Sequence, residues 1–181
     1  MPTTLSGEDR NLVLVGFMGT GKSTVGRILA ARLDRPLMDM DEMIEHRAGK
    51  PITAIFAEDG EPAFRAMERE LVRELSRRGG QLISAGGGVV LDEENMRDFS
   101  ASGLVVCLQA DADEILRRVQ AEEHRPLLSG DKRRQIETRL RERAPFYDAV
   151  PFRIDTTNRS PEEVAGRILE RYRDASRGAN A

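Results

Sequence analysis

Cysteine, histidine and lysine are scarce in this chain of 181 residues, which has one cysteine and two histidines. A single cysteine, Cys107, cannot form a disulfide within the chain, which excludes a domain held together by internal disulfides. Because Cys107 lies in the apolar stretch 104–108, we expect a small buried side chain and a reducing, cytoplasmic compartment. The histidines, His46 and His124, match no motif, so we assign both to the surface.

Long apolar runs are also absent. No segment approaches the roughly 20 apolar residues that cross a bilayer, and residues 1–9 lack the cationic and apolar blocks of a signal peptide. A formal net charge of −3 and a pI near 5.6 argue against a broad basic surface for nucleic acid. We therefore expect no membrane and no nucleic acid among the partners, and a local site for small anionic molecules.

The length of the chain is typical of one domain with a sizeable core. We predict a single domain over residues 1–181, without internal repeats or a second catalytic module. The sequence shows no extended apolar surface, which favours a monomer.

The strongest pattern in the sequence is residues 16–24, which match G-x-x-x-x-G-K-[ST] directly after the apolar run 12–15. Glycines let successive backbone N–H groups approach phosphate oxygens, and the start of the following helix adds a positive dipole end. Lys22 supplies a cation for the outer phosphates, and Ser23 offers a hydroxyl group to Mg²⁺. The pattern predicts that a nucleoside triphosphate binds to Gly19, Thr20, Gly21, Lys22, Ser23 and Thr24.

Apolar strand candidates alternate with helical patterns along the chain. Such alternation indicates a mainly parallel sheet with helices on both faces, which is a three-layer α/β fold. A polar segment that contains Pro126 and Gly130 interrupts the helical patterns, and we interpret residues 121–131 as a mobile loop. The pattern predicts five strands, at 12–15, 36–38, 81–84, 103–109 and 152–154, and helices at 24–33, 41–47, 62–78, 111–120, 131–143 and 161–173.

Two carboxylates, Asp39 and Asp41, follow the second predicted strand. The carboxyl ends of parallel strands face the ligand crevice of such folds. We expect Asp39 to lie near Mg²⁺ and Asp41 near an acceptor hydroxyl group. The alternative is that Asp41 caps the following helix, which is a common role of aspartate.

Together with the phosphate loop, these residues resemble the shikimate kinases, a family of P-loop small-molecule kinases similar to the nucleoside monophosphate kinases. Residues 56–68 resemble the family signature F-x-x-x-G-E-x-x-F-R-x-x-E at every fixed position. Residues 125–128 resemble the R-P-L-L lid motif, residues 143–147 resemble R-x-P-L-Y with Phe146 in place of Leu, and residues 155–161 resemble the loop that covers adenine. The triple glycine of the family is similar to Gly86, Gly87 and Gly88.

The resemblance implies an acceptor region at about residues 39–70, with shikimate as the acceptor. It assigns the carboxylate of shikimate to Arg65 and Arg143, because a planar guanidinium group matches a carboxylate and keeps its charge. Glu68, three residues after Arg65, is expected to hold that guanidinium group in place. The ring hydroxyl groups are assigned to Asp41 and to the backbone of Gly86, Gly87 and Gly88, where glycine lets the ring approach closely.

The implied reaction is transfer of the γ-phosphoryl group of ATP to the 3-hydroxyl group of shikimate, with Mg²⁺ as the cofactor. Lys22 would bind the β- and γ-phosphates, Ser23 would ligate the metal directly, and Asp39 would do so through water. Asp41 would orient the acceptor hydroxyl group and accept its proton. The resemblance implies a lid at about 121–131 whose Arg125 closes over ATP, and adenine between Pro161 and Arg118, with Arg117 as the alternative.

Two other functions stay open at this point. A gluconate kinase or a nucleoside monophosphate kinase would have the same architecture, and gluconate also carries a carboxylate; the joint presence of Asp41, Arg65, the triple glycine and Arg143 favours shikimate. A non-catalytic homologue could keep the fold for a binding or regulatory role. Loss of catalytic residues would mark such a homologue, but Lys22, Ser23, Asp39, Asp41, Arg65, Arg125 and Arg143 are all present.

Overall fold

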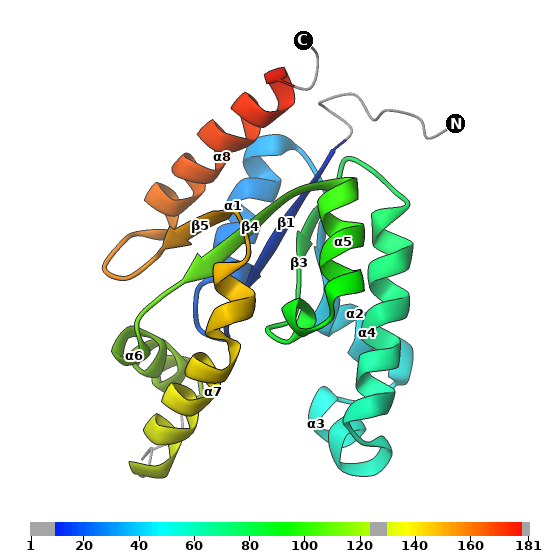
Figure 1. Ribbon diagram of the computed structural model, residues 1–181, viewed down its shortest axis with the longest axis vertical. Helices are drawn as coiled ribbons and strands as arrows, with labels where there is room; N and C mark the ends of the chain where they lie inside the picture. Colours follow the sequence, from blue (N-terminus) through cyan, green and yellow to red (C-terminus); the bar gives the residue numbers. More distant parts are fainter. Residues whose placement is uncertain (1–9, 124–129, 179–181) are drawn as a thin grey trace.

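The core of the protein is a five-stranded parallel sheet, which confirms the predicted α/β fold. The structure is a computed structural model that describes residues 10–123 and 130–178. The strand order is β2-β3-β1-β4-β5, so the strand that leads into the phosphate loop lies in the middle (Figure 1). The strands are β1 (Asn11–Gly16), β2 (Leu37–Asp39), β3 (Leu82–Ser84), β4 (Gly103–Gln109) and β5 (Phe152–Asp155).

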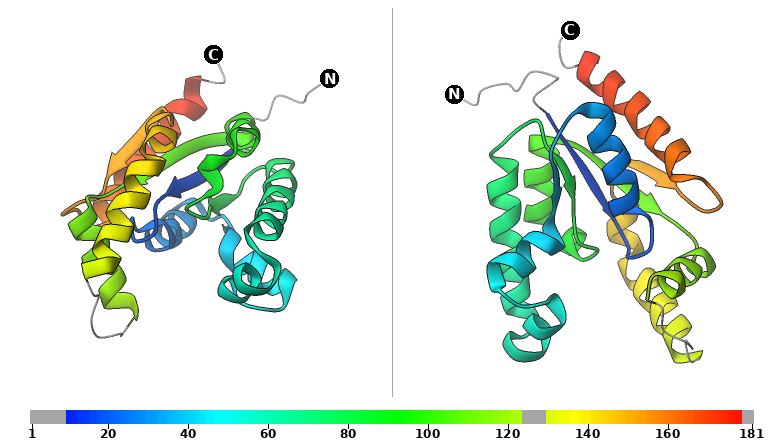
Figure 2. Two further views of the ribbon diagram at one scale, coloured as in Figure 1. Left: turned by 60° about the horizontal axis from the view of Figure 1, so that its bottom comes forward. Right: turned by 180° about the vertical axis from the view of Figure 1, so that it is seen from behind.

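Helices cover both faces of the sheet and make the three layers (Figures 1 and 2). The helices α1 and α8 pack on one face, and the helices α4, α5 and α7 pack on the other. None of the helices in the described ranges is both long and apolar enough to span a bilayer. The helices are α1 (Lys22–Leu33), α2 (Met40–Ala48), α3 (Ile52–Ala54), the π-helix η2 (Ile55–Asp59), α4 (Glu61–Ser76), the 3₁₀ turn η3 (Val89–Leu91), α5 (Glu93–Ser102), α6 (Ala112–Glu123), α7 (Gly130–Asp148) and α8 (Pro161–Gly178).

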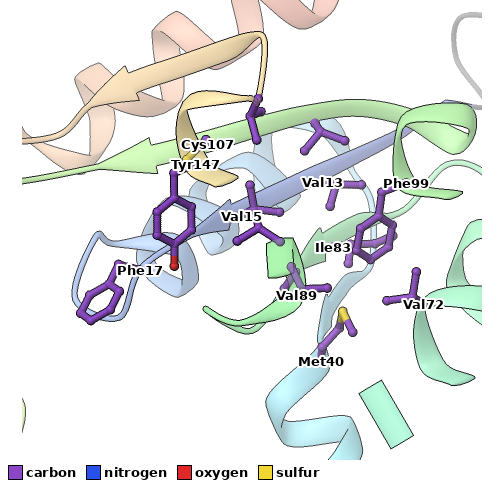
Figure 3. Close-up of a cluster of buried hydrophobic side chains, with 14 of the residues drawn as sticks. Val13, Val15, Phe17, Met40, Val72, Ile83, Val89, Phe99, Cys107 and Tyr147 are labelled. Carbon is purple, nitrogen blue, oxygen red and sulfur yellow. The ribbon is translucent and has the colours of Figure 1, made fainter. Parts of the chain in front are cut away.

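Side chains of β1 alternate between two separate cores, as the pleat of a strand requires. Leu12 and Leu14 pack with α1 and α8, whereas Val13 and Val15 pack with the helices of the opposite face (Figure 3). All four side chains are fully buried, which explains the continuous apolar run. Cys107 of β4 is also fully buried, and burial raises the pKa of its thiol to about 12.

Three differences from the predicted elements have local causes. The helix α5 is absent from the prediction because Phe99 is its one fully buried apolar residue, while Asn95 and Ser102 fill its other inward positions. The segment from α3 to η2, which precedes α4, is helical, although the prediction included no helix there. The helices α6 and α7 extend into the predicted loop 121–131 from both sides, and its residues 124–129 lie outside the described part of the chain.

A buried amide network fastens the end of α4 to the start of β1. The Asn11 side chain is fully buried and donates to the carbonyl groups of Leu75 (3.3 Å) and Arg78 (2.7 Å). Its carbonyl oxygen accepts from the backbone N–H of Gln81 at 3.0 Å, and the Gln81 amide donates to the same two carbonyl groups, at 3.1 Å each. This network fixes α4, the helix that carries Arg65 and Glu68, against the central strand.

We predict that Asn11→Ala lowers the free energy of unfolding by about 2 kcal/mol, because the buried N–H of Gln81 loses its acceptor and a cavity is left. Urea denaturation followed by circular dichroism measures this change. The control is Glu70→Ala on the exposed side of α4, with a change within about 0.5 kcal/mol. Equal stabilities of the two variants would contradict the proposed importance of the network.

Candidate active site

The phosphate loop connects β1 to α1 at the carboxyl edge of the sheet. Gly16 has φ +140°, and a β-carbon there would lie 2.3 Å from the carbonyl oxygen of Leu108, so only glycine fits. The Lys22 ammonium group folds back and donates to the carbonyl oxygens of Gly16 (2.8 Å) and Phe17 (2.9 Å). The buried hydroxyl group of Thr20 donates to Phe17 as well, at 2.7 Å, so two side chains brace the loop from inside.

The loop borders two cavities. One cavity of about 270 Å³ lies between the loop and the end of β2, where Lys22, Ser23, Asp39 and Asp41 line it. The other, also of about 270 Å³, extends toward α6 and α8 and includes Arg117, Arg118, Thr156 and Pro161 in its walls. Both cavities are lined by Gly19, Gly21 and Thr24. The six predicted loop residues are thus in the walls of one or both cavities, as an elongated nucleotide with its phosphates on the loop requires.

Ser23 and Asp39 are adjacent, as their predicted common role requires. The Ser23 hydroxyl group donates to one carboxylate oxygen of Asp39 at 3.3 Å. The other oxygen of Asp39 accepts from the backbone N–H groups of Asp41 (3.1 Å) and Glu42 (3.4 Å). Asp39 is therefore the residue that caps α2, and the alternative that Asp41 is the cap is wrong. The carboxylate of Asp41 is left available to the cavity.

The charge of Lys22 is destabilised by its surroundings. Burial lowers the pKa of Lys22 to about 8, although the carboxylates of Asp41 and Asp39 raise it. The pKa of Asp41 is raised, first by partial loss of hydration between the cavity walls and then by Asp39, while Lys22 and Arg65 lower it. The two groups share one cavity, and each makes the charged state of the other more favourable.

Glycines 86 and 88 make room for charged side chains. A β-carbon at Gly86 would lie 2.8 Å from a carboxylate oxygen of Asp41 and 3.3 Å from one of Glu68. At Gly88 it would lie 2.4 Å from both terminal nitrogens of Arg65. Glycine in this turn thus leaves the space that the side chains of Asp41 and Arg65 occupy. This reason adds to the expected one, that glycine lets a ligand approach closely.

Arg65 and Glu68 form the expected pair on α4. Nη1 of Arg65 donates to Glu68 at 2.6 Å, and its Nε and Nη2 donate to one oxygen of Glu61 at 3.3 and 3.2 Å. Burial raises the pKa of Glu68, which is 2% exposed, and Arg65 and Arg143 oppose that shift. The buried carboxylate of Glu68 thus holds the guanidinium group of Arg65 in place. The contact with Glu61 was not predicted, although Glu61 lies four residues before Arg65 on the same helix.

Arg143 reaches the same glycine turn from α7. Its Nη1 donates to the carbonyl oxygen of Gly87 at 3.3 Å, and its guanidinium carbon lies 5.8 Å from the centre of the Phe17 ring. The hydroxyl group of Tyr147 donates to the same carbonyl oxygen at 2.6 Å. The structure therefore brings the two predicted carboxylate-binding arginines, Arg65 and Arg143, to one turn.

Arg118 connects the phosphate loop to the loop after β5. It donates to the carbonyl oxygen of Gly19 (3.2 Å) and to both the hydroxyl and the carbonyl oxygen of Thr156 (3.0 and 2.8 Å). Glu114 accepts hydrogen bonds from Arg118 at 2.7 Å and from Arg117 at 2.8 Å. These hydrogen bonds lower the pKa of Glu114 to about 2, and the bond from Arg117 has the larger effect. Sequence reasoning missed Thr156 because its contacts reach Arg118 and Thr20, which are far away in the chain. It also missed Glu114, although the contacts of Glu114 with Arg117 and Arg118 lie within α6.

Arg125, the predicted lid cation, lies outside the described residues, so the structure does not test its position.

The parallel sheet and a phosphate loop that faces a cavity lined with carboxylates and cations define a P-loop kinase of small molecules. The family model described as shikimate kinase matches residues 18–173, so the chain belongs to the shikimate kinase family. The shikimate kinase of Desulforudis audaxviator is 47% identical over 161 residues, which are 89% of this chain and 85% of the relative. That of Thermodesulfovibrio yellowstonii is 40% identical over 170 residues, or 93% and 98% of the two chains.

Solved structures agree with this membership. The shikimate kinase from Acinetobacter baumannii, solved in complex with shikimate, matches with a TM-score of 0.81 and 34% identity over 89% of this chain and 91% of that chain. A gluconokinase from Sinorhizobium meliloti matches with a TM-score of 0.59 and 15% identity over 94% of this chain and 95% of that chain, a likeness that shows the shared fold alone.

We predict that Lys22 titrates near pH 8 in the protein without ligands, more than two units below the ordinary lysine value of 10.5. Its pKa is lowered by folding, so the folded state disfavours the protonated lysine, and stability gained from its deprotonation grows between about pH 8 and pH 10.5. The chain has three lysines, Lys22, Lys50 and Lys132, which simplifies NMR detection of their side chains.

Lys50 is the internal control, because hydrogen bonds to Asp59 and Glu58 raise its pKa. Addition of a nucleoside triphosphate should raise the pKa of Lys22 alone. A Lys22 signal that titrates at or above the Lys50 signal in the free protein would contradict the prediction.

Proposed function

We propose that this protein transfers the γ-phosphoryl group of ATP to the 3-hydroxyl group of shikimate and releases shikimate 3-phosphate and ADP. The observation that carries the proposal is the arrangement at one edge of the sheet: Lys22 and Asp41 share a cavity, and Arg65 and Arg143 meet at the adjoining glycine turn. Membership of the shikimate kinase family and the similarity to a structure solved with shikimate support it.

ATP would lie along the phosphate loop, with its phosphates on the backbone of Gly19, Thr20 and Gly21 and its γ-phosphate toward Asp41. Phosphate oxygens would replace the two carbonyl groups that Lys22 contacts in the structure. Adenine would enter the second cavity between Arg118 and Pro161. We favour Arg118 over Arg117, because Arg118 also contacts the phosphate loop at Gly19, whereas the hydrogen bonds of Arg117 go to Glu114. Arg125, in a lid at about 121–131, would complete the cation set around the phosphates.

The donor set near the loop suits Mg²⁺. Ser23 offers one hydroxyl oxygen, and Asp39 offers the carboxylate oxygen that faces Ser23. Among the described residues there is no cluster of three or more histidine, cysteine or carboxylate side chains, which is compatible with an ion bound chiefly by phosphate oxygens and water. When bound there, Mg²⁺ would neutralise part of the phosphate charge.

The acceptor would be held by ion pairs and by directional hydrogen bonds. Arg65 and Arg143 would bind its carboxylate, while Asp41 and the backbone of Gly86, Gly87 and Gly88 would bind its ring hydroxyl groups. The 3-hydroxyl oxygen would form the new bond to phosphorus as the bond from phosphorus to the bridging oxygen breaks, and ADP would leave with that electron pair. Asp41 would accept the hydroxyl proton, for which its raised pKa suits it better than a solvated aspartate.

The alternative functions differ from the proposed one in what the acceptor region must bind. A gluconate kinase would need one cation for the carboxylate, whereas this turn brings together two guanidinium groups, and likeness to the gluconokinase extends to the fold alone. A non-catalytic homologue would not need Lys22, Ser23, Asp39 and Asp41 around one cavity. We further propose a single domain over residues 1–181 that acts as a monomer in the cytoplasm, with the acceptor region at about 39–70.

The proposal is tested by turnover with ATP and Mg²⁺ against shikimate, quinate, gluconate and nucleoside monophosphates. We expect phosphate transfer to shikimate, and its loss by at least about a thousandfold in Lys22→Ala, because the developing charge on the phosphates loses a partly buried cation. Lys50→Ala is the matched control, since Lys50 contacts Glu58 and Asp59 away from the cavity. Transfer to another acceptor but not to shikimate would refute the proposal.

We also predict that Gly88→Ala weakens shikimate binding by about tenfold or more, because the new methyl group displaces the Arg65 guanidinium group. Isothermal titration calorimetry measures the effect. The control is Gly166→Ala in α8, where a β-carbon would meet nothing within 4 Å. Unchanged affinity in Gly88→Ala would show that Arg65 does not bind the acceptor from its present position.

A further inference from the structure

We propose that Tyr147 is a positioning residue, whose hydroxyl group sets the orientation of Arg143 through the carbonyl oxygen of Gly87. The inference rests on the proposed function, in which Arg143 binds the carboxylate of shikimate. Tyr147 itself touches neither the acceptor nor the nucleotide in this scheme. Its effect would reach the substrate through Arg143, the other donor to the carbonyl oxygen of Gly87.

One carbonyl oxygen receives two donors from the same helix. Tyr147 donates at 2.6 Å, a short distance for a hydroxyl donor, whereas Arg143 Nη1 donates at 3.3 Å, a long distance for a guanidinium donor. The geometry indicates that Tyr147 makes the stronger bond and Arg143 makes a loose one. A loosely held guanidinium group keeps most of its donors free for a ligand carboxylate.

Tyr147 is held in place by packing as well as by its hydrogen bond. The ring belongs to the core on the α4, α5 and α7 side of the sheet and is 4% exposed (Figure 3). Burial raises the pKa of its hydroxyl group, whereas hydrogen bonding with Arg143 and the charges of Arg143 and Arg65 lower the pKa. The hydroxyl group is therefore neutral at ordinary pH, and as a neutral donor it finds its acceptor in Gly87.

Gly87 lies where three parts of the site converge. A β-carbon there would lie 3.5 Å from the carbonyl oxygen of Gly16, 3.6 Å from the N–H nitrogen of Met18 and 3.8 Å from Nη1 of Arg143. The bond from Tyr147 thus fixes the turn against both the phosphate loop and α7. Without it, the carbonyl oxygen of Gly87 would keep Arg143 as its one remaining donor in the described structure. The guanidinium group would then move toward the carbonyl oxygen and away from the acceptor.

The test is Tyr147→Phe, which removes the hydroxyl group and keeps the buried ring. We expect the KM and the Kd for shikimate to rise by about fivefold, with kcat changed by less than about twofold and the KM for ATP unchanged. Tyr172→Phe is the matched control, because Tyr172 is the only other tyrosine in the sequence. Tyr172 lies in α8 on the opposite face of the sheet, and its hydroxyl group donates to the carbonyl oxygen of Arg10 at 2.7 Å.

A double-mutant cycle separates positioning from a general loss of structure. In the Arg143→Ala background, Tyr147→Phe should no longer change the Kd for shikimate, because the group it positions is gone. An effect of equal size in both backgrounds would overturn the proposal and leave Tyr147 a purely structural residue. Unchanged shikimate affinity in Tyr147→Phe alone would overturn it as well.

A second measurement does not depend on how the variant folds. Uniform labelling of the natural sequence with 3-fluorotyrosine gives two ¹⁹F signals, from Tyr147 and Tyr172. Saturation with shikimate should shift the Tyr147 signal, since Arg143 exchanges its contact with Gly87 for the carboxylate, and should leave the Tyr172 signal in place. Two unmoved signals would overturn the inference while the proposed function stands. Failure of the natural protein to bind shikimate would overturn both.

Discussion

The site depends on close backbone contact at two glycines. At Gly16 the strand β1 passes so near the carbonyl oxygen of Leu108 that no side chain fits, and this contact sets where the phosphate loop leaves the sheet. At Gly88 the guanidinium group of Arg65 occupies the space that a β-carbon would need. The cavity beside the phosphate loop and the turn at residues 86–88 are thereby placed next to each other with little freedom. A methyl group at Gly16 would collide with backbone, and one at Gly88 would displace the paired guanidinium group of Arg65.

The cations of the described site already have partners inside the chain. Lys22 is held by two carbonyl groups, Arg65 by two glutamates, Arg118 by Glu114 and Arg143 by Gly87. Such pairing keeps the side chains in one arrangement before any ligand arrives, so less ordering remains to be done on binding. An incoming anion exchanges one set of acceptors for another. This exchange is easiest where the internal partner is a neutral carbonyl group, as it is for Lys22 and Arg143.

Much of the fold was predictable because the apolar pattern is strong. Buried strand segments such as 12–15 and 104–108 are continuously apolar, and the phosphate loop fixes the position of the first helix. The helix α5 was not predictable in this way, because Asn95 and Ser102 occupy its inward positions. In the candidate site, motif positions predicted Lys22, Asp39, Asp41, Arg65 and Arg143, and the structure places these five residues at the same edge of the sheet. Thr156 and Tyr147 were missed as contributors because their contacts join residues 38 to 136 positions apart, a separation that no local pattern encodes. Glu114 was missed although its partners, Arg117 and Arg118, lie on the same helix.

The burial of Cys107 has a practical consequence. A buried thiol with a pKa of about 12 carries almost no thiolate at neutral pH. Alkylating reagents and mild oxidants should therefore not react with Cys107 in the native chain. A cysteine introduced on the surface would therefore be the sole reactive thiol. Paired dyes or spin labels could be attached without first removing the natural cysteine, and distances across the molecule could be followed while substrates bind.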